Sequence, residues 1–173
     1  LVVGGVGGWL ILGQGKEDSA TQSASSPEMT DSGQGSVETV ATGSTVGIVK
    51  NESNDLLEWT VGANYLGDNT YNLIFTADID DRYHIFSLND FSSPVFDYVF
   101  EKGVTFGEMT EKTKPVKEID EFGATIEIHY NQAIFEQTVK ITDDTEISGW
   151  IMTTLCNQDS QCVANECEFA ITL

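Results

Sequence analysis

Apolar and polar side chains alternate along most of the chain from residue 48 onward. The alternation is clear in Leu57-Trp59-Val61 and clearer still in Tyr71-Leu73-Phe75-Ala77. Because successive side chains of a β-strand point to opposite faces, this period predicts strands with one buried face. Further strands are expected at 83–87, 95–100, 104–108, 124–130, 133–141, 146–155 and 168–173. No stretch shows a helical period over about 11 residues or more, so no helix is expected.

The expected strands are short and follow one another at spacings of roughly 8–12 residues, with Gly, Asn and Asp between them. This spacing predicts an all-β fold, a single antiparallel β-sandwich that covers residues 48–173. Aromatic residues at every second position, such as Phe96, Tyr98 and Phe100, are expected in its core.

The chain before residue 48 has a different composition. Residues 1–12 are apolar but include four glycines, and they are too few to span a bilayer, which takes ~20 apolar residues. We interpret them as the remnant of a signal or membrane anchor that would tether the protein, with a segment buried against a partner as the alternative. Residues 13–47 are rich in Ser, Thr, Gly, Gln and acidic residues. Such a composition predicts a flexible linker.

Charge and motifs exclude several classes of partner and cofactor. The net charge is −20 and the pI is about 4.1. Proteins bind nucleic acids and anionic membrane surfaces through clustered Lys and Arg, so neither is expected as a partner. The sequence has no phosphate-binding glycine loop, zinc-ligand spacing, CxxC pair or GxSxG motif, so no cofactor or metal is expected. The run of Asp78, Asp80 and Asp81 lacks the Gly and distal Glu of a calcium loop and is interpreted as a solvated turn.

The chemistry of the chain is expected at two cysteines near its end. Cys156 and Cys162 enclose five polar residues between two strand-like runs, and a short turn can bring two Cα atoms within the roughly 4.4–6.8 Å of a disulfide. So small a ring stabilises a fold by only about 2 kcal/mol. The pair is therefore either a staple at the end of a hairpin or a bridge that is made and broken. Cys167 is a thiol buried in a strand or has a second partner, and three cysteines favour an oxidising compartment.

The order of motifs in residues 57–173 resembles the amino-terminal periplasmic domain of DsbD, the thiol:disulfide interchange protein. Only the five-residue gap between the two cysteines, in its strand context, is a specific match. The other matching pieces are Leu57-Glu58-Trp59, Tyr71-Asn72-Leu73-Ile74-Phe75-Thr76-Ala77 with the acidic turn after it, Tyr83-His84-Ile85-Phe86-Ser87, Ala133-Ile134-Phe135-Glu136-Gln137 and Gly149.

This resemblance implies an immunoglobulin-like sandwich that acts in the periplasm or cell envelope. Members of that family accept reducing equivalents from a thioredoxin-like domain and pass them to periplasmic disulfide-exchange proteins. By position, Cys156 and Cys162 would be the redox pair of a thiol:disulfide oxidoreductase. Asp120-Glu121-Phe122 would be its cap loop, with the Phe122 ring over the disulfide, and His84 and Phe86 would lie near the pair.

Particular roles follow for these residues. Cys156 continues a strand and is expected to be partly buried, whereas Cys162 follows a polar turn and would exchange with partners. Asp120 and Glu121 would disfavour a thiolate or relay a proton. The alternatives are an exposed acidic turn with one core phenylalanine, and for His84 a strand histidine on a half-polar surface.

The sequence also departs from the family. Val163 and Ala164 stand where prolines often follow the second cysteine, and Cys167 is additional, with the capacity to exchange with the pair. A second function therefore stays open: a non-catalytic, immunoglobulin-like subunit of an envelope assembly whose disulfide is a staple.

Overall fold

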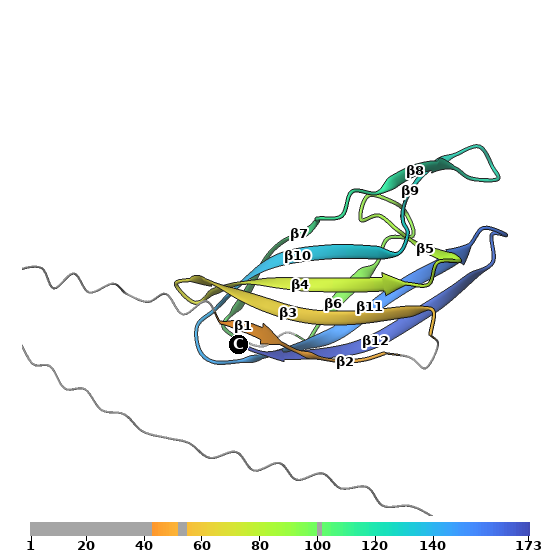
Figure 1. Cartoon of the computed structure of the whole chain (residues 1–173). Coiled ribbons are helices and arrows are strands. Elements are labelled where there is room, and N and C mark those ends of the chain that lie inside the picture. The colour runs from red at the N-terminus through yellow and green to blue at the C-terminus, as the bar shows by residue number, and fades with distance from the viewer. Residues whose placement is uncertain (1–42, 52–54, 100–101) are drawn as a thin grey trace, which may run out of the picture. The chain divides into compact units, whose positions relative to one another are not determined.

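The computed structural model describes residues 43–51, 55–99 and 102–173, and these form strands and turns (Figure 1). The segment 1–12 and most of the expected linker 13–47 lie outside the described residues. None of the described residues forms a helix that is long and apolar enough to cross a membrane. The strands are β1 (Ser44–Val46), β2 (Ile48–Lys50), β3 (Leu57–Gly67), β4 (Thr70–Ile79), β5 (Tyr83–Phe86), β6 (Val95–Tyr98), β7 (Val104–Glu111), β8 (Val116–Ile119), β9 (Thr125–His129), β10 (Gln132–Ile141), β11 (Glu146–Asn157) and β12 (Cys162–Thr172).

The strands pair antiparallel in two sheets, which confirms the expected immunoglobulin-like antiparallel β-sandwich. One sheet has the order β1-β3-β4-β10-β7, and the other has the order β2-β12-β11-β5-β9-β8, with β6 also paired to β11. The alternation in the sequence explains why they face each other. It turns one row of apolar side chains per strand inward, and burying these rows is the main favourable term in folding.

Aromatic rings fill the space between the sheets. Trp59 and Phe75 are fully buried, and the ring of Phe96 lies 5.7 Å from that of Trp59 and 4.9 Å from that of Phe75. Tyr98 packs against the core and donates its hydroxyl hydrogen to Gln137 Oε1. The core positions expected for Phe96 and Tyr98 are thus confirmed, whereas Phe100 lies outside the described residues.

The chain switches sheets at Gly47. Strand β1 pairs with β3, and β2, after a single residue, pairs with β12 in the other sheet. A Cβ atom at Gly47 would lie 2.6 Å from both the Ala170 carbonyl oxygen and Val61 Cγ1, so only glycine fits the crossing. Within the described residues, the sheets begin at Ser44, upstream of the expected boundary at residue 48.

The hairpin of β11 and β12 carries the cysteines. Its register runs without a break from Glu146 opposite Thr172 to Cys156 opposite Cys162. The last strand was expected to begin at residue 168. It begins at Cys162, because pairing with β11 decides its structure. The sequence did not indicate the first half of the strand, since most of its side chains are exposed and alternate little.

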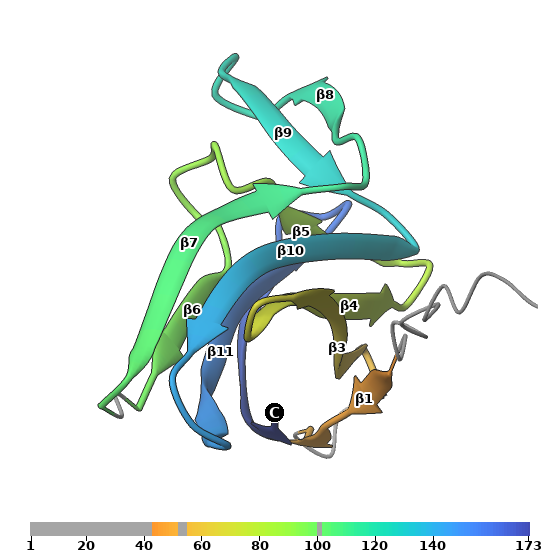
Figure 2. The same ribbon diagram turned by 90° about the vertical axis from the view of Figure 1, so that its left-hand side faces the viewer.

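A second hairpin, of β8 and β9, lies beyond β5 at the edge of the same sheet (Figure 2). It joins the sheet where Ile85 pairs with His129 and Phe86 pairs with Ile128. Its four-residue outer strand, β8, is exposed throughout. The tips of the two hairpins lie at the same end of the sandwich (Figure 1).

Candidate functional site

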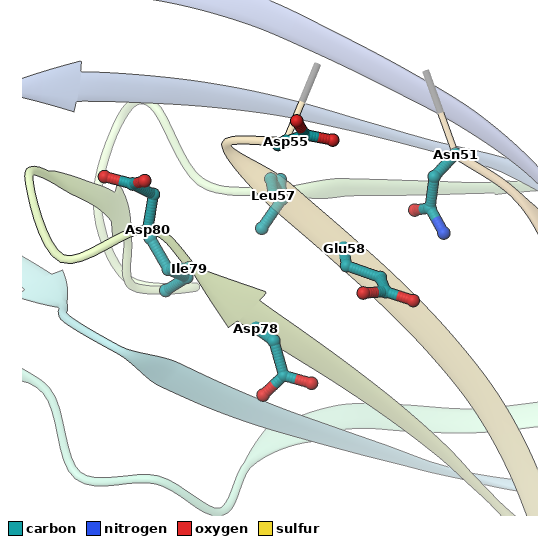
Figure 3. Close-up of a pocket in the computed structure, with 7 residues that line it drawn as sticks. All are labelled: Asn51, Asp55, Leu57, Glu58, Asp78, Ile79 and Asp80. Carbon is teal, nitrogen blue, oxygen red and sulfur yellow. The ribbon is translucent and has the colours of Figure 1, made fainter. Parts of the chain in front are cut away.

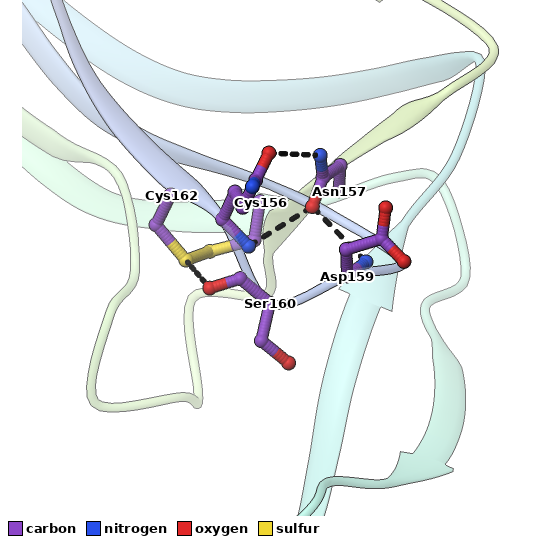
Figure 4. Close-up of a disulfide and its surroundings, with 6 residues drawn as sticks. Cys156, Asn157, Asp159, Ser160 and Cys162 are labelled. Carbon is purple, nitrogen blue, oxygen red and sulfur yellow. Dashed lines mark hydrogen bonds between the residues drawn. A yellow bond between two sulfur atoms is a disulfide. The ribbon is translucent and has the colours of Figure 1, made fainter.

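A disulfide joins Cys156 and Cys162 across the last register pair of the β11–β12 hairpin (Figure 4). The two Cα atoms are 4.1 Å apart, as expected for directly opposed residues that share no backbone hydrogen bonds. Side chains alternate along β11, and Ile151 and Leu155 point into the core. Cys156 lies an odd number of residues from each of them, so its side chain points to the opposite face of the sheet. The disulfide therefore lies on the outer face.

The turn between the cysteines is held by Asn157. Its backbone N–H donates to the Gln161 carbonyl at 3.0 Å, and its side-chain Oδ1 accepts from the N–H groups of Asp159 at 3.0 Å and Gln161 at 2.9 Å. Ser160 has a φ of +59°. This is the three-residue hairpin loop that ends in a left-handed residue.

The turn of the other hairpin is built in the same way. Asp120 Oδ1 accepts from the N–H groups of Phe122 at 2.9 Å and Ala124 at 2.7 Å, and Gly123 takes the left-handed position with a φ of +82°. Asp120 was expected to act on the thiolate. The structure shows that one oxygen of its carboxylate fixes the turn that presents Glu121 and Phe122, and its action on a thiolate stays a prediction.

The two turns form the walls of a pocket of about 470 Å³ with the disulfide on its floor. The pocket contains every residue expected at the site. These are Cys156, Cys162, Asp120, Glu121, Phe122, His84 and Phe86. Glu118, Phe91, Ile126 and Tyr130 also line it. These four were not expected, because they come from a loop and from strands that only the tertiary fold brings together.

Aromatic rings surround the inner sulfur. His84 is the register partner of Cys156 on the neighbouring strand, and its ring centroid lies 5.5 Å from Phe86 and 5.6 Å from Tyr130. Phe86 packs with Cys156 and Ile128 in a small buried cluster. Burial lowers the pKa of His84, against an opposing contribution from the Glu118 carboxylate.

The two cysteines differ in exposure. Cys156 is 4% exposed, whereas Cys162 is exposed and its Sγ lies 3.9 Å from the Ser160 carbonyl oxygen (Figure 4). Thiol exchange needs an approach in line with the S–S bond, so the attacked sulfur must be the accessible one. The geometry therefore favours attack on Cys162 with Cys156 as the leaving sulfur.

Two solved structures are similar to this chain in fold. One is the DsbD N-terminal domain of Neisseria meningitidis in the reduced form, with 17% identity over 65% of this chain and 84% of that chain and a TM-score of 0.47. The other is the complex between the DsbD N-terminal and PilB N-terminal domains from Neisseria meningitidis, with 16% identity over 66% of this chain and 88% of that chain and a TM-score of 0.43. No protein-family model and no curated protein matches the sequence.

Phe122 does not lie in the core, and that alternative is wrong. Its side chain is 87% exposed at the tip of the β8–β9 hairpin, so the pocket over the disulfide is open in this structure. We expect Phe122→Ala to change the free energy of unfolding by less than about 0.5 kcal/mol in urea titrations. If the ring closes over the disulfide in solution, the same variant will be reduced faster by dithiothreitol. A loss of about 3 kcal/mol or more would instead mean that the ring is buried in solution.

Cys167 is separated from the disulfide by the sheet itself. It is 2% exposed and belongs to the core between the sheets, whereas Cys156 and Cys162 lie on the outer face. Exchange between Cys167 and the pair, which the sequence allowed, therefore requires unfolding. We expect iodoacetamide to label Cys167 only in urea concentrations that unfold the protein, as measured by peptide mass spectrometry. Labelling of the native protein would contradict this placement.

An acidic pocket of about 510 Å³ lies at the ends of β3 and β4 (Figure 3). Asp80 is paired with Arg82 at 2.8 Å, and hydrogen bonds from Arg82 lower the pKa of Asp80 to about 2. Asp78 accepts from Gln132 Nε2 at 2.7 Å. In the described part of the chain, no group of three or more His, Cys, Asp or Glu side chains is placed to hold a metal ion.

Proposed function

We propose that this chain is a thiol–disulfide exchange domain of the periplasm or cell envelope. In this proposal the Cys156–Cys162 pair receives reducing equivalents from a thioredoxin-like donor and passes them to envelope proteins. One observation carries the proposal: the disulfide lies on the floor of an open pocket with one sulfur exposed and the other held in the sheet.

The surroundings of the disulfide argue against a staple. The hairpin is already held by an unbroken register and by the hydrogen bonds of Asn157. The bridge spans six residues within that hairpin, and a ring of this size adds only about 2 kcal/mol to stability. The bridge does not join the two sheets to each other, so it adds little to the stability of the fold.

The reaction is a pair of thiol–disulfide exchanges. A donor thiolate attacks Cys162 Sγ, forms a mixed disulfide, and leaves the electron pair of the broken S–S bond on Cys156. A second donor thiolate then attacks the donor sulfur of the mixed disulfide and releases Cys162. Two electrons pass to the pair, and the two sulfurs take up protons from the donor or from water. The same steps in reverse reduce a disulfide of the recipient protein.

The rim of the pocket indicates which protein surface would dock on it. The rim exposes apolar side chains, with Phe91 at 88%, Phe122 at 87% and Ile119 at 67% exposure. Exposed carboxylates stand beside them at Glu118 and Glu121. Apolar anchors within a charged rim are typical of specific docking. We therefore propose partners that surround their reactive cysteine with apolar residues and basic charge.

The redox equilibrium of the pair tests the proposal. The protein is equilibrated with mixtures of reduced and oxidised glutathione, and the fraction of Cys156–Cys162 disulfide is measured by mass spectrometry after acid quenching. A carrier must exchange at its partners' potentials, so we expect a value above about −300 mV. A lower potential would favour the other function, a non-catalytic subunit of an envelope assembly with a stapling disulfide.

A further inference from the structure

We propose that the imidazole of His84 accepts the thiol proton of Cys156 when the pair is reduced, and so controls how fast Cys156 closes on a mixed disulfide at Cys162. This inference rests on the proposed function, because it assigns a step of that exchange to a residue outside the pair.

The placement of His84 carries the inference. His84, Cys156 and Cys162 form a row across β5, β11 and β12, since each is the register partner of the next. Directly opposed side chains have Cβ atoms about 4.5–5.5 Å apart, and all three residues line the same pocket. Apart from Cys162, His84 is therefore the nearest titratable neighbour of the buried sulfur along the sheet.

One nitrogen of His84 has no hydrogen-bond partner among the described residues. Its residue is 8% exposed, and Nδ1 is buried without a hydrogen bond. Leaving a buried polar atom unsatisfied is unfavourable, and such an atom at a reactive site suggests a partner in another state. Opening the disulfide creates that partner, because the reduced Cys156 carries an S–H group.

The charge around His84 suits a proton acceptor. The titratable groups that face it are Glu118, Asp120 and Glu121 from the β8–β9 hairpin, Tyr130, Cys156 and Cys162. Burial lowers the pKa of His84 more than Glu118 raises it, so the ring is neutral at pH 7 and has a lone pair available. Burial also raises the pKa of Tyr130, which keeps that hydroxyl protonated and unable to accept the proton.

Oxidation of the reduced pair by a recipient disulfide takes two exchanges. The Cys162 thiolate of the reduced protein attacks a recipient disulfide, which releases one recipient thiolate and leaves a mixed disulfide. His84 takes the proton of the Cys156 thiol, and the Cys156 thiolate attacks Cys162 Sγ. The Cys156–Cys162 bond forms as the mixed disulfide breaks. The second recipient sulfur leaves with the electron pair, and the proton passes from His84 to it or to water.

The test follows ring closure with glutathione as the recipient. Reduced protein is mixed with oxidised glutathione, and the conversion of the Cys162–glutathione adduct to the internal disulfide is timed by acid quench and mass spectrometry across pH 5–9. Removing the acceptor by His84→Phe should lower the fraction of Cys156 that is present as the thiolate, so closure at pH 7 should slow about threefold and its pH profile should move upward. His84→Gln, which restores an acceptor oxygen, should recover part of the rate.

Two controls separate this role from a structural one. Tyr65→Phe removes a hydroxyl outside the pocket, where Tyr65 packs against Tyr71, so its closure profile should match that of the unmodified protein. In the unmodified protein, the proton resonances of His84 should titrate at different pH in the oxidised and reduced states. The inference is overturned if His84→Phe leaves the profile in place, if Tyr65→Phe shifts it equally, or if His84 titrates identically in both states.

Failure of this inference is distinct from failure of the proposed function. Closure by glutathione needs no natural partner and can be measured on protein reduced by any strong reductant. A pair with the low potential of a structural disulfide but a His84-dependent closure profile would refute only the carrier role. A normal potential with an unmoved profile would refute only the role of His84.

Discussion

Cys156→Ser should give a protein that traps its partner through Cys162, whereas Cys162→Ser should trap none. Cys162 is exposed on the pocket floor, and Cys156 is 4% exposed in the sheet. An incoming thiol or disulfide reaches only the exposed sulfur in line, and without Cys156 the mixed disulfide has no internal thiol to resolve it. Oxidised glutathione serves as the first probe, and non-reducing gels of an envelope extract serve as the second. We expect at least about tenfold more adduct at Cys162 than at Cys156.

The double variant Cys156→Ser/Cys162→Ser is the matched control for this experiment. It retains only Cys167, which lies in the core between the sheets, and it should form no adduct in the native state. Equal trapping by the two single variants would show that both sulfurs are reachable and that their roles are not distinct. Adducts on Cys167 in the double variant would show that the sandwich opens under the conditions used.

The sequence predicted the sandwich where the alternation was strong. Leu73 and Phe75 of β4 are buried as expected, opposite Ala63 and Val61 of β3. It failed where strands have little buried surface. No clear alternation of apolar and polar residues marks the three-residue strand β1 or the first half of β12. Each is a strand because the strand beside it, β3 or β11, supplies its hydrogen bonds.

The site was predicted only in part, for a similar reason. The five-residue spacing marked Cys156 and Cys162, and an Asp followed three residues later by a Gly at Asp120 and Gly123 is a local signal for the turn that the structure shows. Tyr130 has no such signal. It reaches the pocket because β9 pairs with β5, a contact between segments far apart in the chain.

A buried network at Glu111 joins the two sheets behind this site. Glu111 Oε1 accepts from the Leu88 N–H at 2.7 Å and lies 2.9 Å from His129 Nε2, and Oε2 accepts from the Ser87 hydroxyl at 3.0 Å. Glu111 ends β7 of one sheet, whereas Ser87 and Leu88 follow β5 and His129 ends β9 in the other. The network therefore fixes the ends of the two strands that carry His84, Phe86 and the β8–β9 hairpin.

Glu111→Ala should lower the free energy of unfolding by about 3–5 kcal/mol, because it leaves up to three donors without their acceptor. Urea titration followed by tryptophan fluorescence measures this loss. The matched control is Glu136→Ala, which removes the ion pair with Lys112. The Lys112 side chain is 53% exposed, so this loss should cost less than about 1 kcal/mol.

Glu111→Ala should also speed reduction of Cys156–Cys162 by dithiothreitol in the folded state, since β5 and β9 would hold the pocket less firmly. A loss no greater than that of the control would mean that packing alone joins the sheets here. An unchanged reduction rate despite the full loss of stability would mean that the site does not depend on this network.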